Sequence, residues 1–250
     1  MERKLFLRKG IAALGVAFVA PLAPGCRKSN DESADSGSES SSGSGSSSGT
    51  CTASPTETEG PFPTKSPSGL QRTDIRDDRT GVPLSIEIAI RNLNNNCAAL
   101  AGAIVDIWHC DKDGYYSEYG GTGMQSVNYT GVHFLRGRQV TDSNGVVKFT
   151  SIFPGWYSGR ATHIHVHIYN AGGASLLVTQ ISFPEGSSSA VVTVNSSAGT
   201  AYGYTKGMTG YTYNASDNIF SDDTGNIERA TISGSISAGY ALTHNIQVKG

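Results

Sequence analysis

The 250-residue chain has little of several features that would assign it to a class at once. Its four cysteines include no Cys-x-x-Cys pair, so a cysteine-based zinc site is disfavoured. The formal net charge of −2 gives no reason to expect a nucleic-acid partner. No apolar run reaches the roughly 20 residues of a membrane-spanning helix. Neither an internal repeat nor a long amphipathic helical pattern is evident.

Residues 1–25 have the pattern of an export signal. Met1 to Lys9 carries four basic residues, and Ile11 to Ala20 is an unbroken run of small and apolar residues. The segment Arg3-Lys-Leu-Phe-Leu resembles a variant of the twin-arginine export motif, and Cys26 stands where a bacterial lipoprotein signal is cleaved and lipidated. We therefore expect an exported protein, either tethered to the cell envelope through a lipidated Cys26 or extracellular after ordinary signal cleavage.

Residues 26–50 predict a disordered tether. From Ser29 to Thr50 the chain is almost entirely serine, glycine and acidic residues, which cannot bury enough apolar surface to offset the entropy of ordering. The folded part is then expected to be residues 51–250.

This remaining part is rich in short runs that alternate apolar with polar residues, separated by glycine, asparagine, aspartate or proline. The runs are Leu84–Ile90, Ala103–Trp108, Val146–Phe149, His163–Tyr169, Leu176–Phe183, Ala190–Val194 and Ala230–Ile236. Regular short strands with turn residues between them predict an all-β fold, an antiparallel sandwich or barrel.

Three cysteines, Cys51, Cys97 and Cys110, lie in the predicted folded part. In an exported domain we expect one disulfide and one remaining thiol. The sequence does not choose among the three pairings.

The segment from Tyr157 to His165 concentrates chemically active side chains. It contains a phenol, the Arg160 guanidinium and two imidazoles, those of His163 and His165. On a strand, side chains two positions apart share a face about 6.6 Å apart along the chain, so the two imidazoles can converge on one metal ion.

A second cluster lies upstream, where a predicted strand ending at Trp108 breaks into an Asp-Lys-Asp-Gly turn followed by Tyr115 and Tyr116. Imidazole suits several metals, but a phenolate ligand requires an ion acidic enough to displace a proton whose ordinary pKa is near 10. Ferric iron fits best. Two phenolates, from Tyr116 and Tyr157, and one hydroxide would balance its three charges in a buried site.

These residues resemble the intradiol ring-cleavage dioxygenases, a family of non-haem ferric enzymes. The similarity runs through Thr56–Phe62, Val105–Ser117, Phe134–Gly137, Val140–Gly145, Pro154–His165 and Thr179–Gln180. The resemblance implies a β-sandwich with long loops that carry the active site. It also implies a reaction in which dioxygen is inserted into a catechol-type aromatic diol to give a cis,cis-muconate-type diacid.

Carried over by position, the resemblance makes Tyr116, Tyr157, His163 and His165 the ligands of non-haem Fe(III). The ligand matching Tyr157 leaves when the diol chelates. Arg160 matches the arginine that steadies charge on the ring, and Gln180 matches a polar residue near the substrate oxygens. The partners implied are a small aromatic diol and O2.

This chain departs from the cytoplasmic members of the family in two ways. The stretch from Tyr157 to His163 is shorter, so the pocket wall formed there is different or open. No counterpart of their N-terminal helical dimerisation region is evident, and nothing else in the sequence sets a number of subunits.

Two other functions stay open on the residues alone. A non-catalytic β-sandwich that binds carbohydrate or protein at the cell surface would explain the strands and the tether, but it gives the Tyr157–His165 cluster no role. His167 adds a third imidazole to the same strand face, which would allow a three-histidine zinc enzyme. Stoichiometric iron and a visible colour distinguish the dioxygenase from both.

Overall fold

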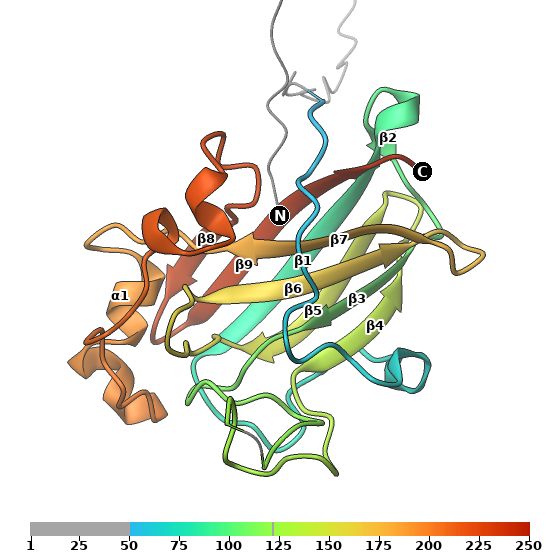
Figure 1. Cartoon of the computed structure of the whole chain (residues 1–250). Helices are drawn as coiled ribbons and strands as arrows, with labels where there is room; N and C mark the ends of the chain where they lie inside the picture. The colour runs from blue at the N-terminus through green and yellow to red at the C-terminus, as the bar shows by residue number, and fades with distance from the viewer. Residues whose placement is uncertain (1–50, 122) are drawn as a thin grey trace, which may run out of the picture. The chain divides into compact units, whose positions relative to one another are not determined.

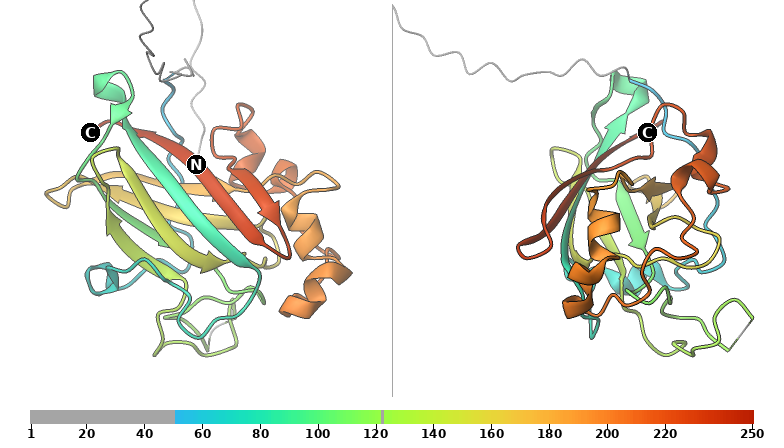
Figure 2. Two further views of the ribbon diagram at one scale, coloured as in Figure 1. Left: turned by 180° about the vertical axis from the view of Figure 1, so that it is seen from behind. Right: turned by 90° about the vertical axis from the view of Figure 1, so that its left-hand side faces the viewer.

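The alternating runs form two β-sheets that pack face to face (Figures 1 and 2). The computed structural model describes residues 51–121 and 123–250. The predicted export signal, the tether and Cys26 lie outside these residues. Within the described part, no helix combines the length and the apolar character needed to span a membrane.

One sheet has the strand order β2-β1-β9-β8 with β5 also paired to β1, and the other has the order β4-β3-β6-β7. The strands are β1 (Pro83–Asn92), β2 (Ala98–Ala99), β3 (Ile104–Trp108), β4 (Arg136–Val140), β5 (Val146–Ile152), β6 (His163–Tyr169), β7 (Ser175–Ser182), β8 (Thr231–Ser235) and β9 (Gly239–Val248). The helical segments are η1 (Pro67–Leu70), η2 (Leu93–Asn95), α1 (Ala190–Val194), η3 (Ser197–Tyr202), η4 (Asn214–Ser216) and η5 (Phe220–Asp222).

The predicted sandwich is confirmed, with one exception to its antiparallel pairing. Strands β1 and β9 run parallel, with Leu84 opposite Tyr240 and Asn92 opposite Val248. Parallel neighbours need a long connection between them, and here most of the domain separates the two strands. A pairing between such distant segments leaves no local signal in the sequence.

The prediction of a strand at 190–194 was wrong, because these residues form the short helix α1. Ser189 caps it, with its side-chain oxygen accepting a hydrogen bond from the backbone N–H of Val192. Val191 and Val194 are its buried residues. The valine-rich composition favours a strand, but the cap and the packing of these valines decide the local structure.

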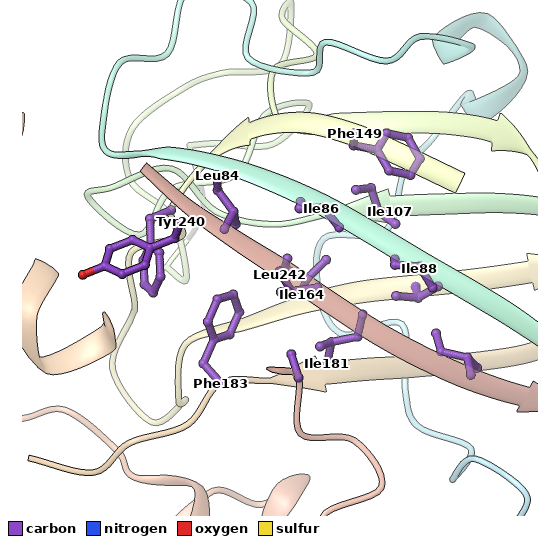
Figure 3. Close-up of a cluster of buried hydrophobic side chains, with 14 of the residues drawn as sticks. Leu84, Ile86, Ile88, Ile107, Phe149, Ile164, Ile181, Phe183, Tyr240 and Leu242 are labelled. Carbon is purple, nitrogen blue, oxygen red and sulfur yellow. The ribbon is translucent and has the colours of Figure 1, made fainter. Parts of the chain in front are cut away.

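The core lies between the two sheets and consists of the inward side chains of both (Figure 3). Ile86 and Ile88 from β1 face Ile107 from β3 and Ile164 from β6, and all four are at most 1% exposed. Alternation along β6 turns Ile164, Val166 and Ile168 into this core. The histidines of β6 therefore point away from the core, to the outer face of the sheet.

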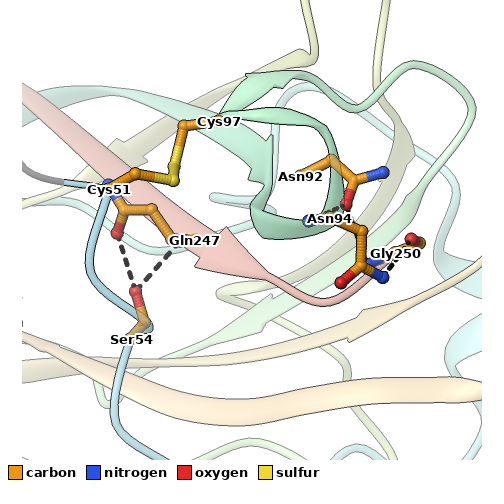
Figure 4. The surroundings of a disulfide bond; sticks show 7 residues. All are labelled: Cys51, Ser54, Asn92, Asn94, Cys97, Gln247 and Gly250. Atoms are coloured by element: carbon orange, nitrogen blue, oxygen red, sulfur yellow. Dashed lines mark hydrogen bonds between the residues drawn. A yellow bond between two sulfur atoms is a disulfide. The ribbon is translucent and has the colours of Figure 1, made fainter.

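The disulfide joins Cys51 to Cys97, with the two Cα atoms 5.8 Å apart, and leaves Cys110 as a buried thiol (Figure 4). Next to it, Ser54 and Gln247 exchange hydrogen bonds, with the Ser54 side chain donating to the Gln247 amide oxygen over 3.1 Å. The bond attaches the start of the described chain to Cys97, just before β2, and the contacts of Ser54 with Gln247 attach it to β9.

Replacing Cys51 and Cys97 together with serine should lower the free energy of unfolding by up to about 4 kcal/mol, because the bond closes a loop spanning 46 positions. Urea unfolding with and without reductant measures this. The wild type under reducing conditions and the double variant should unfold at the same urea concentration. If reductant does not change the urea concentration at which the wild type unfolds, the disulfide does not stabilise the folded domain.

Residues 51–66 cross the outer face of the β4-β3-β6-β7 sheet (Figure 1). The backbone N–H of Glu57 donates to the carbonyl oxygen of Val178 in β7 over 2.8 Å. Gly60 has a φ of +68° and lies directly against His165, since a Cβ at this position would come within 2.9 Å of the His165 ring. This segment therefore covers the face on which the histidines stand.

Candidate active site

Strand β6 brings His163 and His165 together on the covered face of the sheet. Both are buried, and their Nε2 atoms lie 3.1 Å apart. Across the β6–β7 ladder, His165 pairs with Gln180 and His163 with Ser182. The side chain of Gln180 is therefore placed on the same face by the strand register.

The hydrogen bonding of His163 settles which nitrogen carries the proton. Its Nδ1 lies 2.6 Å from the carbonyl oxygen of Ala161, which can only accept a hydrogen bond. Burial, followed by the charge of Arg160, lowers the pKa of His163 to about 3, so the ring is neutral. The Nε2 lone pair consequently faces the site, as a metal ligand requires.

Tyr116 reaches the histidines from the loop after β3. Its hydroxyl lies 3.2 Å from His163 Nε2, and the side chain is fully buried. The amide of Gln125 holds the loop by bonding to both the N–H and the carbonyl oxygen of Tyr116. Tyr115 instead packs near Tyr129, so the structure places Tyr116 rather than Tyr115 beside the histidines.

Tyr157 approaches from the loop between β5 and β6, with its hydroxyl 3.5 Å from His163 Nε2. The two tyrosine loops touch at Gly114, where a Cβ would lie 2.5 Å from the carbonyl oxygen of Trp156. Only a glycine allows this approach at the observed φ of +92°. The side chain of Tyr157 is half-buried, whereas that of Tyr116 is completely enclosed.

Burial raises the pKa of both phenols, and for Tyr116 the rise is large. The next influence on Tyr157 is the positive charge of Arg160, which lowers its pKa. Burial also lowers the pKa of His165 well below its ordinary value. The site is therefore built from neutral groups, and only a strongly acidic ion could displace the phenolic protons.

These four side chains fit a single metal ion. Donor atoms each about 2.1 Å from one ion, at roughly right or tetrahedral angles, lie about 3.0–3.4 Å apart, and the observed separations from His163 Nε2 are 3.1, 3.2 and 3.5 Å. The Nδ1 of His165 is buried with no hydrogen-bond partner among the described residues. The Trp108 indole, stacked 5.0 Å from this ring at an interplanar angle of 2°, orients it instead.

Arg160 and Gln180 belong to one hydrogen-bond network beside the four donors. The Nη2 of Arg160 donates to Gln180 Oε1 over 2.6 Å, and Gln180 Nε2 donates to the carbonyl oxygen of Thr58 over 2.9 Å. Arg160 Nε donates to the carboxylate of Asp217 over 2.9 Å. No described residue accepts a geometrically good hydrogen bond from its Nη1, and the guanidinium lies close enough to Tyr157 to lower the pKa of that phenol.

Asp217 was not predicted from the sequence. It is fully buried, and besides Arg160 it accepts hydrogen bonds from the backbone N–H groups of Ala161, Ile219 and Phe220. It lies 57 positions from Arg160 in a segment with no recognisable motif, so no signal in a single sequence could have indicated it.

Arg136 is a second residue that was not predicted, although it lies in one of the matched motifs. It is fully buried and donates to Ser117 Oγ, the Ser117 carbonyl oxygen, the Phe62 carbonyl oxygen and Thr64 Oγ1, over 2.7 to 3.0 Å. It thereby connects the tyrosine loop to the covering segment. Burial lowers its pKa to about 10, so the guanidinium stays charged at neutral pH.

His167 bonds to residues other than the four donor side chains. Its Nε2 bonds to Ser175 Oγ over 2.8 Å, and its Nδ1 lies 2.9 Å from the Tyr169 hydroxyl and 3.1 Å from Glu59. In the described part of the chain, histidine, cysteine, aspartate and glutamate side chains nowhere form a group of three that could hold a metal. The three-histidine zinc alternative therefore has no support in the structure.

Comparisons with known proteins show which family the chain resembles. Residues 58–199, more than half of the chain, match the family model described as Dioxygenase. A solved structure of an intradiol ring-cleavage dioxygenase from Tetranychus urticae is 31% identical, with a TM-score of 0.66 over 79% of this chain and 94% of that one. The dioxygenase domain of a carbohydrate-binding fusion protein from Streptomyces sp. SirexAA-E shares the fold, at 24% identity and a TM-score of 0.54, over 78% of this chain and 97% of that one.

Among curated proteins, chlorocatechol 1,2-dioxygenase of Rhodococcus opacus is 29% identical in an alignment 128 residues long, which covers 44% of this chain and 46% of that protein. The chain thus spans less than half the length of the curated relatives it matches. The T. urticae structure, in contrast, is matched over nearly its whole length. On the family match, this structural similarity and the convergence of the two tyrosines with the two histidines, the chain belongs to the intradiol ring-cleavage dioxygenase family.

Proposed function

We propose that this protein is an Fe(III)-dependent intradiol dioxygenase. It would insert both atoms of O2 into a catechol-type diol and break the ring bond between the two hydroxylated carbons, giving a cis,cis-muconate-type diacid. The observation that carries the proposal is the meeting of the Tyr116 and Tyr157 hydroxyls with the Nε2 atoms of His163 and His165. A non-catalytic binding module has no use for such an enclosed set of donors.

When bound, ferric iron would supply the Lewis-acid and redox chemistry that joins a diol to dioxygen. Tyr116, Tyr157, His163 and His165 would hold it. Two phenolates would balance two of the three positive charges of the ferric ion. A buried site needs this balance because its imidazoles are neutral.

The protein's own residues have distinct tasks around this centre. Tyr157, the less buried of the two tyrosines, could as a phenolate accept a proton at its oxygen from an entering diol. Arg160, held by Asp217 and Gln180, would direct its positive charge at negative charge developing on the ring. The segment through Thr58 and Gly60 covers the face and excludes water.

The test is metal analysis together with oxygen uptake. The purified, iron-reconstituted protein should hold one iron per chain, show a visible tyrosinate-to-iron charge-transfer band, and consume oxygen with catechol or a substituted catechol. Material that is colourless and iron-free after reconstitution would contradict the proposal, and stoichiometric zinc would reopen a hydrolytic function.

Replacing Tyr157 with phenylalanine should weaken and shift the visible band without abolishing it, since Tyr116 still provides one phenolate. Turnover should fall by about 10²–10⁴-fold if this phenol accepts a substrate proton. Stopped-flow absorbance under anaerobic conditions would show slower diol binding. Tyr115→Phe, which changes a tyrosine outside the convergence, is the matched control and should leave both readouts unchanged.

A further inference from the structure

The side chain of Arg136 lies between the loop that carries Tyr116 and the segment that covers the histidines. Its Nε donates to Ser117 Oγ over 2.9 Å, and its Nη2 donates to the Ser117 carbonyl oxygen over 2.7 Å. The remaining nitrogen, Nη1, donates to the Phe62 carbonyl oxygen and to Thr64 Oγ1, each over 3.0 Å. One rigid guanidinium therefore bonds both to the residue directly after Tyr116 and to two residues of the covering segment.

The same two segments also touch each other directly. The Phe62 ring stacks on the Tyr116 ring, with the two centroids 4.8 Å apart. The backbone N–H of Lys65 donates to the Glu118 carboxylate, and the Lys65 ammonium donates to the Glu118 carbonyl oxygen, each over 2.7 Å. The covering segment is thus packed against the residues on both sides of Ser117.

The backbone is strained on both sides of Arg136's contacts. Glu118, which follows Ser117, has a φ of +67°, and Leu135, which precedes Arg136, has a φ of +56°. Residues with a Cβ rarely adopt this left-handed conformation, and they keep it only where the surrounding structure holds them. Arg136 is 0% exposed, and its Nε lies 3.8 Å from the Glu118 carboxylate. Because a buried guanidinium is costly unless its N–H groups are bonded, both segments must be in place to accommodate it.

We propose that Arg136 is a positioning residue of the active site, which makes the covering segment and the Tyr116 loop close as one unit and so helps the site to retain iron. Where it concerns iron, the inference rests on the proposed function above. The covering segment reaches two of the four proposed ligands, since Phe62 stacks on Tyr116 and Gly60 lies against His165. If either segment moved away, Arg136 would keep its charge but leave buried N–H groups unpaired on that side. Opening the covering segment and displacing Tyr116 are therefore coupled.

Arg136→Lys tests the bonds while it keeps a positive charge beside Glu118. A lysine ammonium is a compact charge with three donors, and it cannot bond to both segments as the planar fork does. The amide N–H groups of Lys65 and Tyr116 are both hydrogen-bonded, one in each segment. Hydrogen–deuterium exchange on the full chain without iron should become faster at both by about tenfold or more, the scale of one lost hydrogen bond to a charged group.

Iron binding gives a second readout. Arg136→Lys should lower the affinity for iron, measured by competition with a chelator, by about 10–100-fold, as is typical for a residue that orients a metal ligand from outside the metal site. The tyrosinate-to-iron band of the iron-loaded fraction should shift, because Tyr116 is displaced.

Arg138→Lys is the matched control. It makes the same change two positions along β4, on the same face of the sheet, where Arg138 pairs with Asp106 over 2.6 Å. Exchange at Lys65 and Tyr116, iron affinity and the band should all stay at their wild-type values in this variant, whatever it loses in overall stability.

Thr64→Val is the milder test of the coupling, because it removes one acceptor in the covering segment with little change in shape. Exchange should become faster at Tyr116 as well as at Lys65, by a smaller factor than in Arg136→Lys. In the Arg136→Lys background, Thr64→Val should have little further effect, since the bond that it removes is already lost. If Arg136→Lys does not fold, Thr64→Val alone decides the coupling.

Two results would overturn the proposal. Faster exchange at Lys65 alone in Thr64→Val would show that the two segments open independently. An Arg136→Lys protein that is less stable but has wild-type exchange, iron affinity and band would show that Arg136 has a structural role only. A wild-type chain that holds no iron would instead overturn the proposed function, while exchange in the iron-free chain would still decide whether Arg136 couples the two segments.

Discussion

Replacing Arg160 with alanine is expected to leave iron bound and the visible band in place while turnover falls by about 10²–10³-fold, the usual effect of removing one preorganised charge-stabilising donor. The four proposed ligands do not include Arg160, whose guanidinium is held by Asp217 and Gln180. Iron content, the absorption spectrum and oxygen uptake, measured on one preparation, check the expectation.

The conservative variant separates charge from geometry at this position. Arg160→Lys keeps a positive charge but cannot donate to Asp217 and Gln180 in the same fixed arrangement. Its turnover should be intermediate between those of the wild type and the alanine variant. Full turnover in the alanine variant would contradict the assigned role, and loss of iron would show that Arg160 acts on the metal site itself.

Replacing Asp217 with alanine is expected to destabilise the folded domain strongly. It would leave the guanidinium of Arg160 buried without its partner, and removing one member of a buried pair costs about 3–5 kcal/mol. Three backbone N–H groups would also lose their acceptor. Chemical unfolding should show the loss, and oxygen uptake per folded molecule should fall as well because Arg160 is no longer held in position.

Asp106→Ala is the matched control for this prediction. Asp106 is also buried and pairs with an arginine, Arg138, over 2.6 Å, but it lies opposite His167 in the sheet and bonds to none of the four donors. This variant should lose stability while keeping its turnover per folded molecule. If both aspartate variants lost stability and neither lost turnover, Asp217 would be a purely structural residue.

The strands and the donor set were predictable because they depend on short-range patterns. A period of two along 163–169 places His163 and His165 on one face, whatever packs against the other. The glycine turn before Tyr116 and the clustering of Tyr157 with Arg160 are equally local. The helix at 190–194 was mistaken for a strand because valine-rich composition is only a weak guide to such a short element.

Other features depend on contacts between distant segments. The parallel pairing of β1 with β9, the choice of Cys97 as the partner of Cys51, and the ion pair between Arg160 and Asp217 each join residues far apart in the chain.

The sequence alone determined the class of fold, and it indicated four candidate iron ligands and the arginine beside them, because side-chain chemistry and strand periodicity act over a few residues. Only the tertiary structure decided which carboxylate holds that arginine and which segment covers the histidines. Such pairings form when folding closes long loops over a shared core, and any distant segment of suitable chemistry is an equal candidate until that packing chooses one.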